Sequence, residues 1–182
     1  MFVKGTAVRT TLAAVEEVYG AAGLAKVRAA LPPEVATELS GLVLATKSYP
    51  VSVAAAIQEA VRTELGQGTL QANRKVGAAA GRIDFGGVYR VFLRASSYEM
   101  LLGSLDRAFR QYNSQGRVSW ERIEKGEADG AIRDVTGYTE PMWAAIAGRL
   151  EALLLLSGAK SATATIHSTS PEHVELRLRW KS

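Results

Sequence analysis

Four glycines within twelve residues, in the segment VGAAAGRIDFGG from Val76 to Gly87, are the first candidate for chemistry in this sequence. Glycine-rich turns bind phosphate when a strand precedes them and a helix N-terminus follows. Here the polar segment TLQANRK precedes the glycines instead of an apolar strand. The G-x-x-x-G spacing of Gly77 and Gly81, with Ala80 between them, places small residues on one helical face. We therefore predict a surface for helix packing, within the chain or across a homodimer, rather than a nucleotide site.

Histidine and cysteine, the residues that most often hold transition metals, are scarce in this sequence. The chain has no cysteine and only two histidines, His167 and His173. Both fall near the ends of adjacent predicted strands, where surface positions are the ordinary outcome, and the nearest acid is Glu172. Because a catalytic zinc usually takes three protein ligands, this pair does not make a metal site. The lack of cysteine also excludes disulfides, thiolate zinc sites and cysteine nucleophiles.

Acidic side chains gather in one short segment, where Glu121, Glu124, Glu127 and Asp129 surround a predicted hairpin turn. Paired carboxylates catalyse reactions in a cleft that shifts the pKa of one of the two carboxyl groups, whereas a hairpin tip is normally exposed to water. The sequence also lacks the G-x-S-x-G pattern of serine hydrolases. We therefore predict no catalytic residues, no metal and no cofactor, and we do not expect an enzyme.

Aromatic residues alternate with arginines between Phe85 and Tyr112. At helical spacing, aromatic side chains mostly belong to a hydrophobic core. A second hypothesis is that they line a pocket for a small apolar ligand, because such pockets are built mainly from aromatic and aliphatic side chains. The residues expected to line such a pocket are Phe85, Tyr89, Phe92, Phe109 and Trp143.

Positive charge is concentrated in the middle third of the chain, although the net charge of the whole protein is only +4. The segment from Gln71 to Arg122 has nine basic and four acidic residues. A basic surface with interleaved aromatic residues is one way to bind single-stranded nucleic acid. Arginine is also a good helix former, so exposed helix faces explain the same pattern. Nucleic-acid binding therefore stays the alternative hypothesis, and the weaker one.

Apolar spacing predicts helices over most of the chain and strands near its end. Gly20 is expected to end the first helix, and Ser96 with Glu99 predicts a capping box at a later one. Alternation after Gly116 predicts a hairpin. The expected helices are 9–20, 23–31, 50–65, 69–84, 96–113 and 139–157, and the expected strands are 117–124, 130–137, 160–168 and 172–180.

These elements predict an α+β fold of about five helices packed on a four-stranded antiparallel sheet, which two C-terminal hairpins flanking a helix would form. With 182 residues, of which 47% are hydrophobic, the chain has the size and composition of one globular domain spanning residues 1–182. No segment has the apolar length of a signal peptide or of the ~20-residue span that crosses a bilayer. We therefore expect a cytoplasmic protein.

Three segments, FVKGTAVRTTLAAVEEVYG, YPVSVAAAIQEAV and RAFRQYNSQG, resemble a heavily duplicated paralogous family of myxobacterial proteins of about this length. The block MWAAIAGRLEALLLLSGAKSATATIHSTSPEHVELRLRW resembles the C-terminal helix and hairpin of a wider superfamily. That superfamily comprises the haem–nitric oxide binding (H-NOX) domains, the vinyl-reductase-type ligand-binding domains and the TRAPP vesicle-tethering subunits. The resemblance implies helices packed on a twisted antiparallel sheet.

The chain departs from this superfamily at the positions that carry its chemistry. H-NOX domains hold haem iron through a histidine on a central helix and bind the propionates through a Tyr-x-Ser-x-Arg motif. This sequence has no histidine before His167, and its nearest fragment, SSYEM, lacks that motif. The cysteines found in the other two groups are absent as well. The resemblance therefore implies the fold without haem and without a reactive cysteine.

Together, these observations predict a non-catalytic sensory or scaffolding domain of bacterial signalling. It would bind a small apolar ligand or a signalling protein partner, and its small-residue face would pack a helix or form a homodimer. The alternative is a regulatory protein that binds nucleic acid through its Arg-rich helical region.

Overall fold

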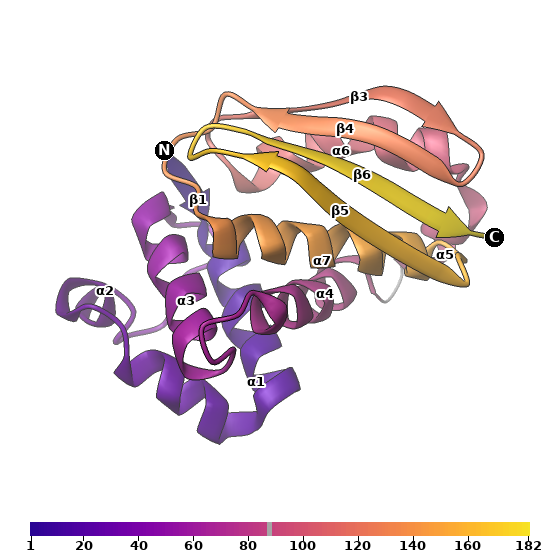
Figure 1. The fold of residues 1–182 in the computed structure, drawn as a ribbon. Coiled ribbons are helices and arrows are strands. Elements are labelled where there is room, and N and C mark those ends of the chain that lie inside the picture. Colours follow the sequence, from indigo (N-terminus) through magenta and orange to yellow (C-terminus); the bar gives the residue numbers. More distant parts are fainter. Residues whose placement is uncertain (87–88) are drawn as a thin grey trace.

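The structure, a computed structural model, describes residues 1–86 and 89–182, with only the backbone of Tyr89, Arg90 and Arg122. Its mixture of helices and antiparallel strands confirms the predicted α+β class (Figure 1). The first elements are β1 (Phe2–Lys4), α1 (Gly5–Ala29), α2 (Pro33–Glu38), β2 (Ser48–Pro50), α3 (Val51–Glu64) and α4 (Gln71–Phe85). The later elements are α5 (Tyr89–Ala95), α6 (Tyr98–Tyr112), β3 (Arg117–Glu124), β4 (Glu127–Arg133), α7 (Glu140–Leu156), β5 (Ser161–Thr169) and β6 (Val174–Lys181).

The larger sheet has four strands in the order β3-β4-β6-β5, and every neighbouring pair is antiparallel. Within the hairpins, β3 pairs with β4 and β5 pairs with β6. The two hairpins are joined because β4 also pairs with β6. α7 packs along the sheet, mainly against β5, and α6 covers β3 (Figure 1). The predicted arrangement of two hairpins that flank a helix is confirmed. The short strands β1 and β2 form a separate two-stranded sheet that the sequence did not reveal.

The second strand of the first hairpin begins earlier than the sequence pattern predicts. Glu124 pairs with Glu127, which leaves a turn of only two residues between them. The second of these, Gly126, has a positive φ of 84°, which glycine adopts at little cost because it has no Cβ atom. The expected strand over 130–137 is therefore wrong at both ends, because the segment EKGEADG is mostly strand.

Ion pairs across the sheet explain why acidic residues occupy these strand positions. Arg177 Nε on β6 lies 2.6 Å from Asp129 Oδ1 on β4. Arg179 Nε lies 2.6 Å from Glu127 Oε2 on the same pair of strands. Directly opposed charges of opposite sign stabilise an antiparallel pair. The acids therefore help to pair β4 with β6 instead of forming a solvated turn.

Gly20 marks a bend within the first helix. Its φ of 69° and ψ of 179° are not helical, yet α1 continues beyond it to Ala29. Because glycine has no Cβ atom, it adopts this left-handed φ at little cost. The two helices predicted on either side of Gly20 are thus two parts of one bent element.

The cap of α6 lies one residue later than expected. Ser97 is the N-cap, and its hydroxyl accepts a hydrogen bond of 3.2 Å from the backbone nitrogen of Met100. The predicted capping box of Ser96 and Glu99 is therefore wrong. Ser96 instead donates a hydrogen bond of 2.9 Å to the carbonyl oxygen of Phe92, at the end of α5. Ser96 therefore bonds to the last turn of α5, a helix that the sequence did not predict, instead of capping α6.

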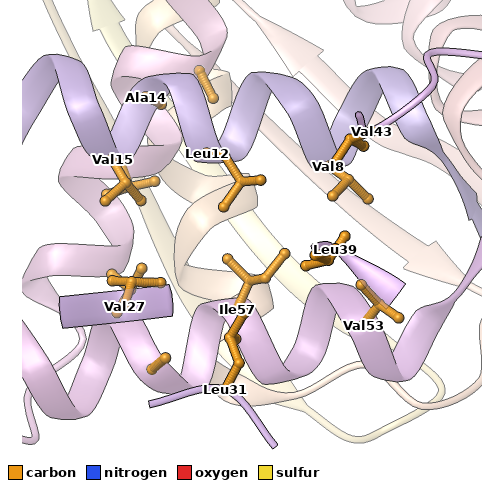
Figure 2. Packing of buried hydrophobic residues seen from close by; sticks show 14 of the residues in the cluster. Val8, Leu12, Ala14, Val15, Val27, Leu31, Leu39, Val43, Val53 and Ile57 are labelled. Atoms are coloured by element: carbon orange, nitrogen blue, oxygen red, sulfur yellow. The ribbon is translucent and has the colours of Figure 1, made fainter. Parts of the chain in front are cut away.

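Buried side chains form two hydrophobic clusters. The first joins α1, α3 and α4, and Figure 2 shows Val8, Leu12 and Val15 of α1 facing Val53 and Ile57 of α3. The second lies between α6, α7 and the larger sheet, and includes Leu102, Ala128, Trp143, Leu154 and Leu178. The molecule therefore has an N-terminal helical core and a C-terminal core built on the sheet.

The two clusters meet where α4 packs on α7 at backbone contact distance. A Cβ atom added to Gly77 would lie 2.7 Å from the Cα atom of Ala145, and closer still to its carbonyl oxygen. A Cβ atom added to Gly148 would lie 2.9 Å from the backbone nitrogen of Ala78. Real Cβ atoms do not approach other atoms so closely. Both helices therefore need glycine at this contact.

The small-residue face predicted on α4 packs inside this chain. Gly77 and Gly81 both face α7, and Ala80 is buried in the first hydrophobic cluster. The glycines thus act in helix packing, as their spacing predicts, with α7 as the partner helix.

None of the described helices, α7 included, is long and apolar enough to cross a membrane.

We expect Gly77→Ala to destabilise the protein by about 1–3 kcal/mol, because the added methyl group must push α4 away from α7. Gly103→Ala is the matched control, since a Cβ atom at this helical position on α6 meets nothing within 4 Å. It should raise stability by about 0.5–1 kcal/mol through helix propensity. Urea denaturation followed by circular dichroism measures both. Equal effects of the two substitutions would contradict the close contact between α4 and α7.

Candidate ligand-binding site

A cavity of about 170 Å³ lies between the two hydrophobic clusters. β1, α1 and α3 line it on one side, α6, α7 and the larger sheet on the other, and the end of α4 also contributes. An engineered cavity of ~150 Å³ binds benzene, so this one has room for a single ring. Its apolar lining residues are Val3, Ala7, Val8, Ala54, Ile57, Phe85, Leu105, Ala108, Phe109, Val118, Ala131, Ile132, Met142, Ala145, Ile146, Leu150, Leu153 and Leu176.

An ion pair joins the last turn of α4 to the middle of α7 at the wall of the cavity. Arg149 Nη1 donates a hydrogen bond to Asp84 Oδ2. The side chain of Asp84 is only 4% exposed, and that of Arg149 is 23% exposed. A buried charge is costly unless it is paired, so each of these side chains depends on the other. The ion pair therefore places two charged side chains in a wall that is mostly apolar.

The hydroxyl group of Tyr138 is a second polar feature of the wall. It donates a hydrogen bond of 3.0 Å to Asn113 Oδ1, and the ring packs on Trp143 with 4.3 Å between centroids. Burial raises the pKa of Tyr138 well above its ordinary value of 10, although the positive charge of Arg149 opposes that shift. Tyr138 therefore remains a neutral hydrogen-bond donor at physiological pH.

Two more polar side chains of the wall, those of Thr11 and Gln58, form hydrogen bonds within the protein, whereas that of Trp120 forms none among the described residues. Thr11 donates a hydrogen bond of 2.9 Å to the carbonyl oxygen of Ala7. Gln58 Oε1 accepts one of 2.9 Å from Asn73 Nδ2. The indole nitrogen of Trp120 is buried but has no hydrogen-bond partner among the residues that the structure describes.

The five aromatic residues that the sequence suggested for a pocket lie in different places. Phe85 and Phe109 line the cavity. Trp143 is buried in the second hydrophobic cluster, outside the lining. Phe92 is 70% exposed and lies away from the cavity, because α5 presents it to solvent. The side chain of Tyr89 lies outside the described part of the chain.

Sequence reasoning missed Trp120, Asp84 and Arg149, although Trp120 and Arg149 each left a signal. Trp120 alternates with Val118 along β3, which places both on the face that lines the cavity. Arg149 interrupts the most apolar helix of the chain. A charge in such a run needs a buried partner, but nothing in the sequence identifies Asp84 as that partner.

The two histidines lie away from the cavity. His173 follows the turn between β5 and β6, where its Nδ1 lies 2.8 Å from Ser170 Oγ, and it lines a separate polar pocket. His167 is exposed on β5. Among the described residues, no group of three or more histidine, aspartate or glutamate side chains could hold a metal ion.

Several arginines of the basic middle third are neutralised by carboxylates. The distances between guanidinium nitrogen and carboxylate oxygen are 2.5 Å for Arg74 and Glu151, 2.9 Å for Arg82 and Glu17, and 3.6 Å for Arg117 and Asp134. Arg110 forms a fourth pair with Asp106. A carboxylate beside a guanidinium competes with phosphate for its hydrogen bonds. The positive charge available to nucleic acid is therefore smaller than the sequence suggests.

This arrangement of helices and sheet is the H-NOX fold. The unliganded Fe(II) H-NOX protein from K. algicida matches with a TM-score of 0.72 at 12% identity, over 98% of this chain and 97% of that one. An oxygen-binding H-NOX domain related to soluble guanylate cyclases matches with a TM-score of 0.70 at 15% identity, over 98% and 95%. No protein-family model and no curated protein matches the sequence. The predicted H-NOX-like fold is confirmed, and the likeness concerns the fold alone.

The residues around the cavity do not fit a haem. Proteins hold haem iron through histidine, cysteine, tyrosine or a methionine–histidine pair. The described wall has neither histidine nor cysteine, so Met142 has no histidine to act with. Two tyrosines line the cavity. The hydroxyl of Tyr138 is bonded to Asn113, and its raised pKa disfavours the phenolate that would bind iron. Tyr112, the other tyrosine of the wall, also has an interaction partner within the protein.

We expect Asp84→Asn to lower the free energy of unfolding by about 1–3 kcal/mol, because it leaves the guanidinium of Arg149 without its counter-charge in a mostly buried place. Glu59→Gln is the control, since it breaks an ion pair with Arg62 in which the two side chains are 48% and 36% exposed. The control should have little effect. Urea denaturation measures both, and similar losses would show that water screens the Asp84–Arg149 pair as it does a surface pair.

The stability of the protein should fall as the pH rises above 10, in part because of Tyr138. Its pKa is higher in the folded state than in the unfolded chain, so its contribution is complete below pH 10 and is lost at higher pH. Tyr138→Phe should cost about 1 kcal/mol at pH 7, through the lost hydrogen bond to Asn113, and should flatten the alkaline decline. Unfolding free energies at pH 7–11 test this, and parallel profiles would refute it.

Proposed function

We propose that this protein is a non-catalytic sensory domain that binds a small apolar ligand in the cavity between its two hydrophobic clusters. The observation that carries the proposal is the cavity itself, about 170 Å³ in volume with mostly aliphatic and aromatic walls. Well-packed protein cores contain few voids larger than a water molecule. An apolar cavity of this size stays dry and takes up apolar molecules.

The place of the cavity supports a sensory role. A ligand there would contact α1 and α3 on one side and α6, α7 and the sheet on the other. It would add contacts to both walls and stabilise the folded state in proportion to its concentration and affinity. A signalling partner that recognises how α1 and α3 are held against α6, α7 and the sheet would then respond to the ligand.

The proposal requires neither haem nor metal, in keeping with the donor set of the described wall. Its ligand is a molecule that the apolar walls bind by shape and burial, with the ion pair of Asp84 and Arg149 as a polar border. The cytoplasmic location, the homodimer and the resemblance to a myxobacterial paralogous family remain predictions from the sequence. Nucleic-acid binding has less support, because carboxylates neutralise several arginines on which it depends.

Benzene is the direct probe of this proposal. Calorimetric titration of the purified protein should give saturable binding, and thermal unfolding should shift to higher temperature as benzene is added. No saturable binding to the wild-type protein would contradict the proposal.

Ala108→Phe tests where the probe binds. Ala108 lines the cavity from α6, so a phenyl group there should fill the space and abolish benzene binding. Ala25→Phe is the matched control, because Ala25 is exposed on α1, away from the cavity. It should leave the benzene affinity unchanged. Equal affinities in both variants would place benzene elsewhere and overturn the assignment of this cavity.

A further inference from the structure

β5 forms one edge of the larger sheet, since the strand order is β3-β4-β6-β5 and β5 pairs with no described strand on its outer side. Such an edge presents unpaired N–H and C=O groups that can pair with a strand of another molecule. Proteins normally protect an edge with charged residues, proline or a bulge. β3, at the opposite edge, has four charged residues among its eight and a register shift in its middle.

The sequence of β5, SATATIHST, has none of this protection over most of its length. It contains no lysine, arginine, aspartate, glutamate or proline. Its register shift falls near its end, between Ile166 and Ser168, so residues 161–166 pair regularly with β6. Uncharged segments of six or seven residues with many β-branched side chains pair readily with copies of themselves. An open edge of this composition would therefore join two molecules unless something covers it.

An ion pair between α4 and α7 covers the middle of this edge. Glu151 Oε1 accepts a hydrogen bond of 2.9 Å from the backbone nitrogen of Ala164, and Arg74 Nη2 donates one to the carbonyl oxygen of Ala164. The two side chains also bond each other, with 2.5 Å between Arg74 Nη2 and Glu151 Oε1 and 3.1 Å between Arg74 Nε and Glu151 Oε2. Together they offer Ala164 one acceptor and one donor, as the backbone of a neighbouring strand would.

The close contact of α4 and α7 holds the ion pair at this place. A Cβ atom added to Gly148 would lie 3.0 Å from the backbone carbonyl carbon of Arg74, and Glu151 follows Gly148 by one helical turn. The side chain of Arg74 is 36% exposed and that of Glu151 is 17% exposed. The pair is therefore fixed by the packing of two helices and is partly shielded from water.

We infer that the edge of β5 is an interface for a second copy of this chain, and that the ion pair of Arg74 and Glu151 keeps this interface closed. While the pair is intact, its two side chains occupy the place where a partner strand would lie. Without the pair, the backbone groups of Ala162, Ala164 and Ile166 are all available, because alternate residues of an antiparallel strand face the same edge. The β5 strand of a second molecule then pairs with them and extends the sheet. Neither the cavity nor its ligand is needed for this pairing.

Arg74→Ala/Glu151→Ala removes the pair without leaving one of its charges unpaired. Analytical ultracentrifugation should find the wild-type protein monomeric and the double variant increasingly dimeric as protein concentration rises. Glu59→Ala/Arg62→Ala is the matched control, since it removes an exposed ion pair on α3, and it should stay monomeric. Adding Thr163→Lys to the double variant should restore the monomer, because lysines on two paired edges repel each other. A folded double variant that associates no more than the wild-type protein would overturn the inference.

Amide hydrogen exchange gives a second readout, which holds even where the double variant fails to fold. In the wild-type protein, the amide of Ala164 should exchange about tenfold more slowly than those of Ala162 and Ile166, because of the three only Ala164 donates to Glu151. Equal rates would show that the ion pair does not cover the edge. In the dimer of the double variant, the amides of Ala162 and Ile166 should become protected. A dimer that leaves both amides exchanging rapidly would place the interface elsewhere, and either of these two results would overturn the inference.

Discussion

The contact between the backbones of α4 and α7 is the constraint on which the rest of the structure depends. Gly77 on α4 and Gly148 on α7 bring the two helices together without intervening side chains. Through this contact the N-terminal hydrophobic cluster is held against the cluster on the sheet. Two rigid helices that touch so closely fix the separation of the elements around them. Beside this contact, where Ala145 also lines the wall, the facing walls stay apart and leave the cavity.

The same two helices place the charged pair. Asp84 follows Gly77 by about two helical turns on α4, and Arg149 follows Gly148 directly on α7, so one contact brings both side chains to the edge of the cavity. In this chain the H-NOX fold holds a mostly apolar cavity of about 170 Å³ with an ion pair in its wall. Because one fold serves many functions, the side chains of the wall, and not the fold, decide which ligand the cavity binds.

Much of the fold was predictable because its signals are local. Apolar spacing located α3, α4, α6 and α7, and alternation located β3, β5 and β6. β4 was misplaced because the charges of EKGEADG imitate a solvated turn, while the arginines that neutralise them lie on β6, far away in sequence. The cavity was beyond prediction for the same reason: Trp120, Asp84 and Arg149 come together only through tertiary packing. Phe85 and Phe109 do line it, whereas Phe92 is exposed on a helix that the sequence pattern did not reveal.

A crystal structure of the protein under xenon pressure would show whether the cavity exists, because xenon enters apolar cavities of this size without any designed contact. We expect a xenon atom between the two hydrophobic clusters, within contact distance of Ile57 on α3 and Leu150 on α7, with α4 and α7 still touching at Gly77. Side chains that close this space and leave no xenon between the clusters would show that the protein has no such binding cavity.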